Sequence, residues 1–349
     1  MTTTDPTETI ETGPARRSTG HHGEQPAGRV LFTMVVALGL AALVNADALV
    51  HRAESKPLGA SRDRSLMIWH PVQDVANVSQ ISRLRDLGDW LVGNEDEGGQ
   101  GVPLASDPDA VPGDAVRPTL RAPTADEPLR VYIGGDSIIR DAGDAFLNIA
   151  SDTPLFETTL HYENATGLTR PDFYDWPAAF AEDMAEHRPE VVFVLFGGND
   201  SQGIIGPNGR ALPGPSDAGW REEYARRVAG VMDLLRADDR VVYWVGLPPM
   251  RDDGFDGRAE VMNEIYRTAA ESRPWMTYLD THPILGDEHG RYVDRKKDAS
   301  GDLVDLRQKD GVHLSQPGAT RLARVMLDLI DEEIQAGREL AATSTTAGG

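Results

Sequence analysis

From residue 129 onward, short apolar segments alternate along the chain with segments of helical spacing. The apolar segments predict strands at 129–134, 155–161, 191–196, 241–246 and 276–280. The segments between and after them predict helices at about 137–150, 218–236, 258–272 and 316–336. Short, nearly continuous apolar strands that alternate with helices are typical of a parallel sheet covered on both faces. The pattern therefore predicts an α/β domain over residues 129–337.

A different pattern lies near the N-terminus, where residues 30–44 carry no charge and apolar character resumes up to residue 50. Its length of about 20 residues suits a membrane-spanning helix, and we expect residues 30–50 to form an uncleaved signal anchor. Two alternatives stay open: a secretory signal cleaved after Ala46-Asp47-Ala48, and a buried helix of a soluble domain. Basic residues flank both ends, so charge does not settle the orientation. Because a single early hydrophobic segment usually directs export of the chain after it, we expect a single-pass protein of the cell membrane with an extracytoplasmic domain.

The remaining segments are polar or short. Residues 1–29 and 338–349 are expected to be disordered tails. Residues 51–93 form a membrane-proximal segment, in which the apolar spacing of residues 75–91 predicts a short amphipathic helix. Residues 94–128 contain six prolines, many acidic residues and no aromatic residue, so we interpret them as a linker that does not bury a core.

Composition excludes several classes of function. The 349 residues carry a formal net charge of -22, which disfavours binding to nucleic acid or to a free polyanion. The absence of cysteine excludes disulfides, thiolate catalysis and cysteine-ligated metal sites. No segment supplies the histidines that a divalent-metal phosphoesterase would need, so we expect neither a metal nor a cofactor.

Candidate chemistry lies directly after two of the predicted strands and just before the last predicted helix. Ser137 comes after two glycines at the end of the first strand, where a nucleophile could meet the N-terminus of a helix. Asn199 comes after the third strand in a Gly-Gly-Asn-Asp turn, and its side chain can donate to an oxyanion. Asp310 and His313 precede the last helix, where the carboxylate can orient the imidazole as a general base. Each of these residues alone suits a helix cap or a turn, but together they supply a nucleophile, a base and an orienting carboxylate.

These blocks resemble the SGNH (GDSL) hydrolase superfamily over about residues 129–335. The resemblance rests on three short sequences, in the first of which isoleucine replaces the usual leucine: Gly135-Asp136-Ser137-Ile138, Gly197-Gly198-Asn199-Asp200 and Asp310-Gly311-Val312-His313. It implies a three-layer α/β/α sandwich with five parallel strands in the flavodoxin-like order 2-1-3-4-5. It also implies that Ser137 attacks an ester, that His313 takes its proton and that Asp310 orients His313.

The resemblance further implies an oxyanion hole formed by the Ser137 N–H, the Gly167 N–H and the Asn199 side chain. Gly167 is the best match to a loosely defined block, Asn164-Ala165-Thr166-Gly167-Leu168. A ping-pong acyl-enzyme would then be resolved by water or by an acceptor hydroxyl.

The predicted anchor, linker and domain together resemble a bacterial envelope branch of this superfamily. This resemblance implies an esterase or O-acetyltransferase that acts on a short acyl ester, such as an acylated envelope glycan, with a membrane-bound acyltransferase as a partner by analogy. The alternative is a catalytically silent envelope protein that uses the fold for binding or scaffolding. Two further residues are candidates for substrate contact: Trp176 for stacking on a sugar, and Arg170 for an anionic group or for a surface salt bridge.

Overall fold

The computed structural model describes residues 104–110, 116–207 and 209–347, with a few short stretches and single residues between 29 and 72. Residues 1–28 of the predicted tail and the amphipathic helix 75–91 lie outside the described residues, as does most of the predicted anchor 30–50. Among the helices that are described, none combines the length and the apolar character of a membrane span. The anchor therefore stays a prediction.

The centre of the domain is a parallel sheet of five strands in the order β2-β1-β3-β6-β7. Counted among these five strands alone, the order is 2-1-3-4-5, so the predicted fold class is confirmed. β3 and β6 lie in the interior of the sheet and are buried at every position, which is why their sequences are continuous apolar runs. The strands are β1 (Leu129–Gly135), β2 (Phe156–Tyr162), β3 (Val191–Leu195), β6 (Val241–Val245) and β7 (Met276–Leu279).

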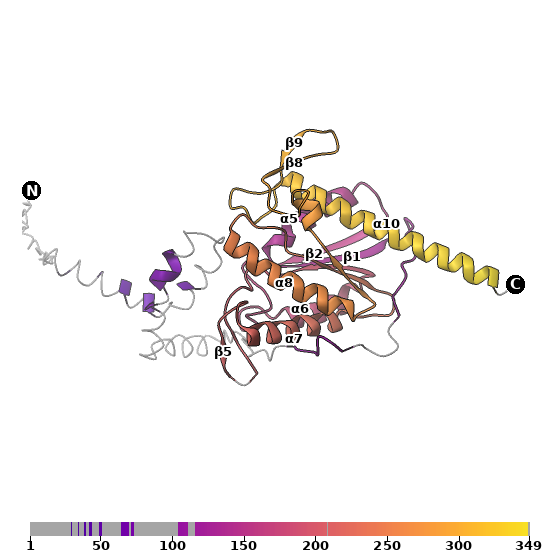
Figure 1. Ribbon diagram of the computed structural model, residues 1–349. Coiled ribbons are helices and arrows are strands. Elements are labelled where there is room, and N and C mark those ends of the chain that lie inside the picture. Colours follow the sequence, from indigo (N-terminus) through magenta and orange to yellow (C-terminus); the bar gives the residue numbers. More distant parts are fainter. Residues whose placement is uncertain are drawn as a thin grey trace, which may run out of the picture.

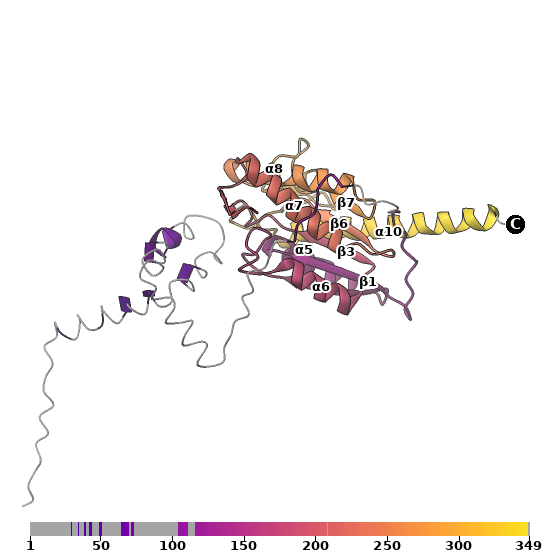
Figure 2. The ribbon, with the colours of Figure 1, turned by 90° about the horizontal axis from the view of Figure 1, so that it is seen from below.

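Helices cover both faces of the sheet and complete the three layers (Figure 1; Figure 2 gives the view from below). One face carries α5 (Ser137–Ala150) and α10 (Gln316–Ala347), which pack against each other. The other face carries α6 (Trp176–His187), α7 (Ala218–Leu234) and α8 (Asp253–Glu271). The smaller elements are α9 (His282–Leu285) and two hairpins, β4 (Ile204–Ile205) with β5 (Ala211–Leu212) and β8 (Arg295–Lys297) with β9 (Leu303–Asp305).

The structure differs from the prediction at both ends of the domain. The terminal helix α10 continues to Ala347, so most of the predicted tail 338–349 is helical. The predicted linker packs against the domain in the parts that are described, residues 104–110 and 116–128. Leu120 is only 4% exposed and belongs to the core, and Arg121 pairs with the buried Glu190 at 2.7 Å.

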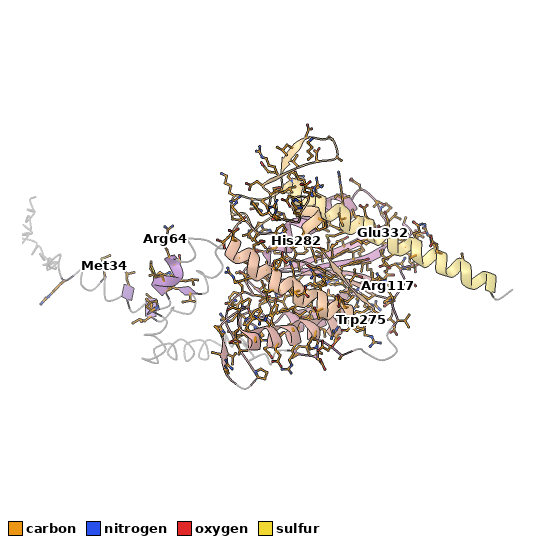
Figure 3. The ribbon with its side chains drawn as sticks, viewed as in Figure 1. Met34, Arg64, Arg117, Trp275, His282 and Glu332 are labelled. Carbon is orange, nitrogen blue, oxygen red and sulfur yellow. The ribbon has the colours of Figure 1, made fainter. Side chains whose placement is uncertain are left out.

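We call the described residues 104–110 and 116–128 the strap. It crosses the end of the domain where Arg117 and Trp275 are labelled in Figure 3, and Arg117 donates to the Thr277 hydroxyl at 3.1 Å. At Ser106 the backbone N–H donates to the Arg226 carbonyl at 2.9 Å. The linker prediction was wrong because composition shows only that these residues form no core of their own. Leu120 instead joins the core of the domain, and hydrogen bonds and ion pairs hold the rest of the strap.

Candidate active site

Three glycine-containing loops meet at the carboxyl edge of the sheet. Gly135, Gly197 and Gly311 have φ angles of 144°, 122° and 75°, which side-chain-bearing residues rarely adopt. A Cβ atom on Gly135 would lie 2.0 Å from the carbonyl oxygen of Leu195. Glycine therefore lets the end of β1 approach the end of β3, and this approach brings the loops of Ser137 and Asn199 together.

The structure brings Ser137, His313 and Asp310 into one hydrogen-bonded chain. The Ser137 Oγ lies 2.9 Å from the His313 Nε2, and the His313 Nδ1 lies 2.7 Å from the Asp310 Oδ2. The other oxygen of Asp310 accepts from the backbone N–H groups of Val312 and His313, at 2.9 and 3.1 Å. The turn between Asp310 and His313 thus fixes the carboxylate against the imidazole, and a proton on Nδ1 leaves Nε2 free to accept from the serine.

The electrostatics of this pair favour a charged histidine. Burial alone would raise the pKa of Asp310, but the hydrogen bond from His313 and the two backbone N–H groups outweigh it and lower this pKa to about 2. Burial lowers the pKa of His313, whereas the hydrogen bond and the charge of Asp310 raise it, and the net effect is a pKa above the ordinary value. An imidazolium formed during a reaction would be stabilised by this neighbour.

Asp136 joins the nucleophile loop to the Asn199 loop. Its side chain is completely buried; Oδ1 caps α5 by accepting from the Ile138 N–H at 2.9 Å, and Oδ2 accepts from the Gly198 N–H at 2.8 Å. Burial raises the pKa of Asp136 to about 7, although both backbone donors act in the opposite direction. The sequence predicts for this residue a place in the motif or local capping of the helix, and the structure shows that it also ties two strand ends together.

The candidate oxyanion donors also lie near one another. The Asn199 Nδ2 donates to the Thr166 carbonyl at 3.1 Å, which places its side chain beside Gly167. An amide NH₂ group carries two protons, so one remains for another acceptor. Ser137 is the first residue of α5, where backbone N–H groups have no partner within the helix. The structure thus joins the Asn199 side chain to the Gly167 loop, and Asp136 joins the Asn199 loop to the loop of Ser137.

The two predicted substrate-binding residues do not fit that role as expected. Trp176 is 0% exposed, and its Nε1 donates to the Thr166 hydroxyl at 2.9 Å. The stacking prediction is therefore wrong, because the ring has no free face for a sugar. Arg170 makes a salt bridge with Asp172 at 2.9 Å, which is the alternative that the sequence had left open.

A second polar cluster, which was not predicted, packs against the Trp176 ring. The His161 Nδ1 lies 2.6 Å from the Asp183 Oδ2, and the His161 Nε2 lies 2.8 Å from the Tyr174 hydroxyl. The Tyr132 hydroxyl also donates to Asp183, at 2.5 Å. Burial and nearby carboxylates raise the pKa of Tyr174 to about 12, so it is no activated nucleophile. No sequence motif links these residues; the only signal is that His161 ends the second predicted strand.

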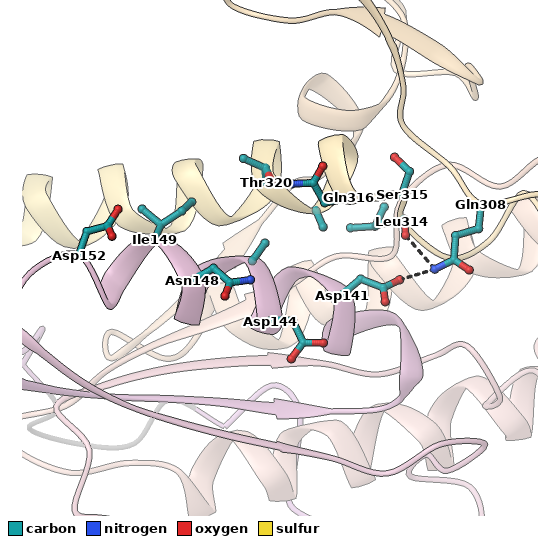
Figure 4. Close-up of a pocket in the computed structure, with 12 residues that line it drawn as sticks. Asp141, Asp144, Asn148, Ile149, Asp152, Gln308, Leu314, Ser315, Gln316 and Thr320 are labelled. Carbon is teal, nitrogen blue, oxygen red and sulfur yellow. Dashed lines mark hydrogen bonds between the residues drawn. The ribbon is translucent and has the colours of Figure 1, made fainter.

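A groove of about 530 Å³ runs between α5 and the start of α10 (Figure 4). It begins one helical turn after Ser137, where the Gln308 side chain bridges the Asp141 carboxylate and the Leu314 carbonyl at 3.0 and 2.9 Å. Apolar side chains and polar ones both line it, and the charged members are all aspartates. The lining residues are Asp141, Asp144, Ala145, Asn148, Ile149, Asp152, Gln308, Leu314, Ser315, Gln316, Ala319 and Thr320.

Sheet order, loop positions and the Ser-His-Asp geometry together define an SGNH (GDSL)-type hydrolase domain. Within the residues that the structure describes, no three His, Asp or Glu side chains converge as a metal ion would require. The chain belongs to the family described as a protein of unknown function (DUF459), whose model matches residues 130–329.

Comparison with curated proteins finds no match. Among solved structures, similar chains include an acetyl xylan esterase from Geobacillus stearothermophilus, with 14% identity, 58% of this chain and 94% of that chain covered, and a TM-score of 0.40. Another is the catalytic domain of peptidoglycan O-acetyltransferase A from Streptococcus pneumoniae, with 16% identity, 61% and 96% coverage, and a TM-score of 0.36. A third is LAE5, an α/β hydrolase enzyme from the metagenome of Lake Arreo, with 15% identity, 58% and 95% coverage, and a TM-score of 0.41. Because the sequence identities and TM-scores are this low, the comparisons support no role for individual residues. The assignment of the candidate site depends on the geometry of this chain alone.

Proposed function

We propose that this domain is a serine esterase or O-acyltransferase that acts on short acyl esters, with Ser137 as nucleophile. The observation that carries the proposal is the chain from Ser137 Oγ through His313 to Asp310, with contacts of 2.9 and 2.7 Å. These are hydrogen-bond distances of a nucleophile to its base and of the base to its orienting carboxylate.

In the first half-reaction, Ser137 Oγ attacks the ester carbonyl carbon while His313 Nε2 takes the serine proton. Negative charge develops on the carbonyl oxygen, which accepts from the N–H groups of Ser137 and Gly167 and from the second N–H of Asn199. His313 then gives its proton to the departing alkoxide, and an acyl group remains on Ser137. In the second half-reaction, His313 takes a proton from water or from an acceptor hydroxyl, which attacks the acyl carbon, and it returns that proton to Ser137.

The groove beside the site supports a polar, extended substrate that is not anionic. Along α5, residues 141–150 span about 14 Å at 1.5 Å per residue, the length of roughly two to three sugar rings. Carboxylates accept hydrogen bonds from hydroxyl groups and amides both accept and donate them, while the half-buried Ile149 offers apolar surface to a sugar ring. We therefore propose a neutral or cationic acylated glycan, and we expect O-acetylated oligosaccharides without uronic acids to be better substrates than those with them.

We further propose that residues 30–50 attach the domain to the outer side of a bacterial membrane, where a membrane-bound acyltransferase could supply the acyl group. The hydrophobic pattern is the support for this attachment. Full-length protein recovered in the soluble fraction after cell lysis would rule it out.

The decisive test of the enzymatic proposal uses residues 104–347. We expect turnover of p-nitrophenyl acetate and a mass increase at Ser137 after treatment with a sulfonyl fluoride, both abolished by Ser137→Ala. Ser151→Ala, at the other end of α5, is the matched control and should behave like the wild type. Equal rates in wild type and Ser137→Ala would support the silent scaffold instead.

A further inference from the structure

Asp200, the residue after Asn199, is a completely buried carboxylate that lies directly against the Gly167 loop. Its Oδ1 accepts from the backbone N–H and from the hydroxyl of Thr169, at 3.0 and 2.9 Å, and the Leu168 N–H also donates to this carboxylate. A Cβ atom on Gly167 would lie 2.1 Å from the same oxygen. The carboxylate thus occupies the space next to Gly167 and fixes the backbone immediately after it.

The other oxygen of Asp200 is held by helices on the opposite side. The Tyr224 hydroxyl of α7 donates to Oδ2 at 2.7 Å and lies 2.8 Å from the Tyr266 hydroxyl of α8. Each hydroxyl has one proton, so Tyr224 must accept from Tyr266 once its own proton goes to Asp200. The Tyr266 proton is then shared between Tyr224 and the Phe196 carbonyl, 3.2 Å away at the end of β3. This chain fixes the position of Asp200 relative to the sheet.

The carbonyl groups of the same loop are held from α7 as well. The Arg227 Nη1 donates to the carbonyls of Leu168 and Thr169, at 3.0 and 3.2 Å, while its Nε donates to Glu223 at 3.0 Å. Leu168 and Thr169 belong to no helix or strand, so buried side chains satisfy both their donors and their acceptors. The loop that carries Gly167 therefore takes its conformation from Asp200 and Arg227.

We propose that Asp200 is a positioning residue of the oxyanion hole, which acts through Gly167 and not on the substrate itself. The inference rests on the proposed function, because it assigns the Gly167 N–H to the oxyanion. A buried carboxylate near developing negative charge opposes that charge, so its benefit must come from geometry. A neutral residue of the same shape should then retain most of the activity, whereas loss of the side chain should not.

The kinetic test compares Asp200→Asn and Asp200→Ala with the wild type on p-nitrophenyl acetate. We expect Asp200→Ala to lower kcat about 100-fold, the usual effect of losing one oxyanion donor, with KM within about threefold because the acyl group is still bound. Asp200→Asn should lose about tenfold or less. Tyr224→Phe, which removes the hydrogen bond to Asp200 and the one from Tyr266 but leaves the carboxylate in place, should show a smaller fall in kcat alone.

Glu190 provides the matched control, since it is a buried carboxylate at the opposite end of the strand that leads to Asp200. Glu190→Gln should lower the melting temperature and leave kcat unchanged. The inference is refuted if Asp200→Ala and Tyr224→Phe keep the wild-type kcat, or if Glu190→Gln loses as much kcat as Asp200→Ala.

Hydrogen exchange at the Leu168 and Thr169 amides separates this inference from the proposed function. We expect these amides to be protected in the wild type and in Asp200→Asn, and to exchange at least about tenfold faster in Asp200→Ala. Unchanged protection in Asp200→Ala would overturn the positioning role even in an active enzyme. If the wild type hydrolyses no ester while protection is lost as expected, the proposed function fails and the structural hold on Gly167 stands.

Discussion

Replacement of Asp310 by asparagine tests the catalytic chain most directly. The asparagine oxygen can keep the two backbone hydrogen bonds of the turn, but its NH₂ group then faces the His313 Nδ1. A donor at this position favours the tautomer with its proton on Nε2, and that nitrogen can no longer accept from Ser137. The fold should survive, whereas the base should be lost.

The structure gives the size of the effect. The pKa of Asp310 falls from its ordinary value of 3.8 to about 2, which corresponds to about 2 kcal/mol at roughly 1.4 kcal/mol per unit, with allowance for partial exposure. The two backbone N–H groups share in this shift, so loss of the interaction with the imidazolium alone lowers the rate by at most about 30-fold. The tautomer change adds to it, and we expect kcat to fall between about 30-fold and 10⁴-fold.

The pH dependence supplies a second, independent readout. His313 must be neutral to accept a proton, and its pKa is raised above the ordinary value of 6.5. Wild-type activity should therefore fall as pH drops through a midpoint above about 6.5. In Asp310→Asn the carboxylate no longer favours the imidazolium, so this midpoint should move to lower pH.

The assay is kcat against pH from 5 to 9, with Asp302→Asn, an exposed aspartate, as the control. The assignment of Asp310 as the orienting carboxylate is refuted if kcat of Asp310→Asn stays within about threefold of the wild type and the midpoint of the fall in kcat at low pH does not move.

Three further substitutions test the packing around the site. Gly135→Ala places its Cβ 2.0 Å from the Leu195 carbonyl and should destabilise the domain by several kcal/mol (about 3 or more); a melting temperature within about 2 °C of the wild type would contradict this. Gly257→Ala, in α8 with no atom near its Cβ, should raise the free energy of unfolding by about 0.4–1 kcal/mol in urea titrations. Trp176→Phe should cost about 1 kcal/mol through the lost Thr166 hydrogen bond and leave KM unchanged; a large rise in KM would restore the sugar-stacking hypothesis.

Much of the fold could be predicted because its signals are local. The buried strands β3 and β6 are continuous apolar runs, and the predicted strand ends lie within about one residue of the observed ones. Helix α6 was missed because Trp176-Pro177 at its start resembles a loop, although proline is favoured in a first helical turn.

The candidate site was predictable to the extent that its residues form short blocks. Ser137, Asn199 and His313 are marked by neighbouring glycines or by an aspartate three residues away. The His161–Asp183–Tyr174 cluster has no such mark, because contacts between β2, α6 and a loop appear only once the chain has folded. Trp176 was misread for a similar reason: sequence shows that it is near the Gly167 block, but not that its ring faces the core.

The contacts of the strap determine how a mechanical force applied to the N-terminal side of the domain would be distributed over the structure. Arg273 donates to the carbonyls of Asp107 and Pro108. Arg121 forms an ion pair with Glu190, the residue that precedes β3. These anchor points lie at the amino edge of the sheet or on the helices beside it, whereas Ser137 and Asn199 lie at the carboxyl edge. A mechanical load from a membrane tether would thus be spread over several attachments and largely dissipated before it reached the reacting groups.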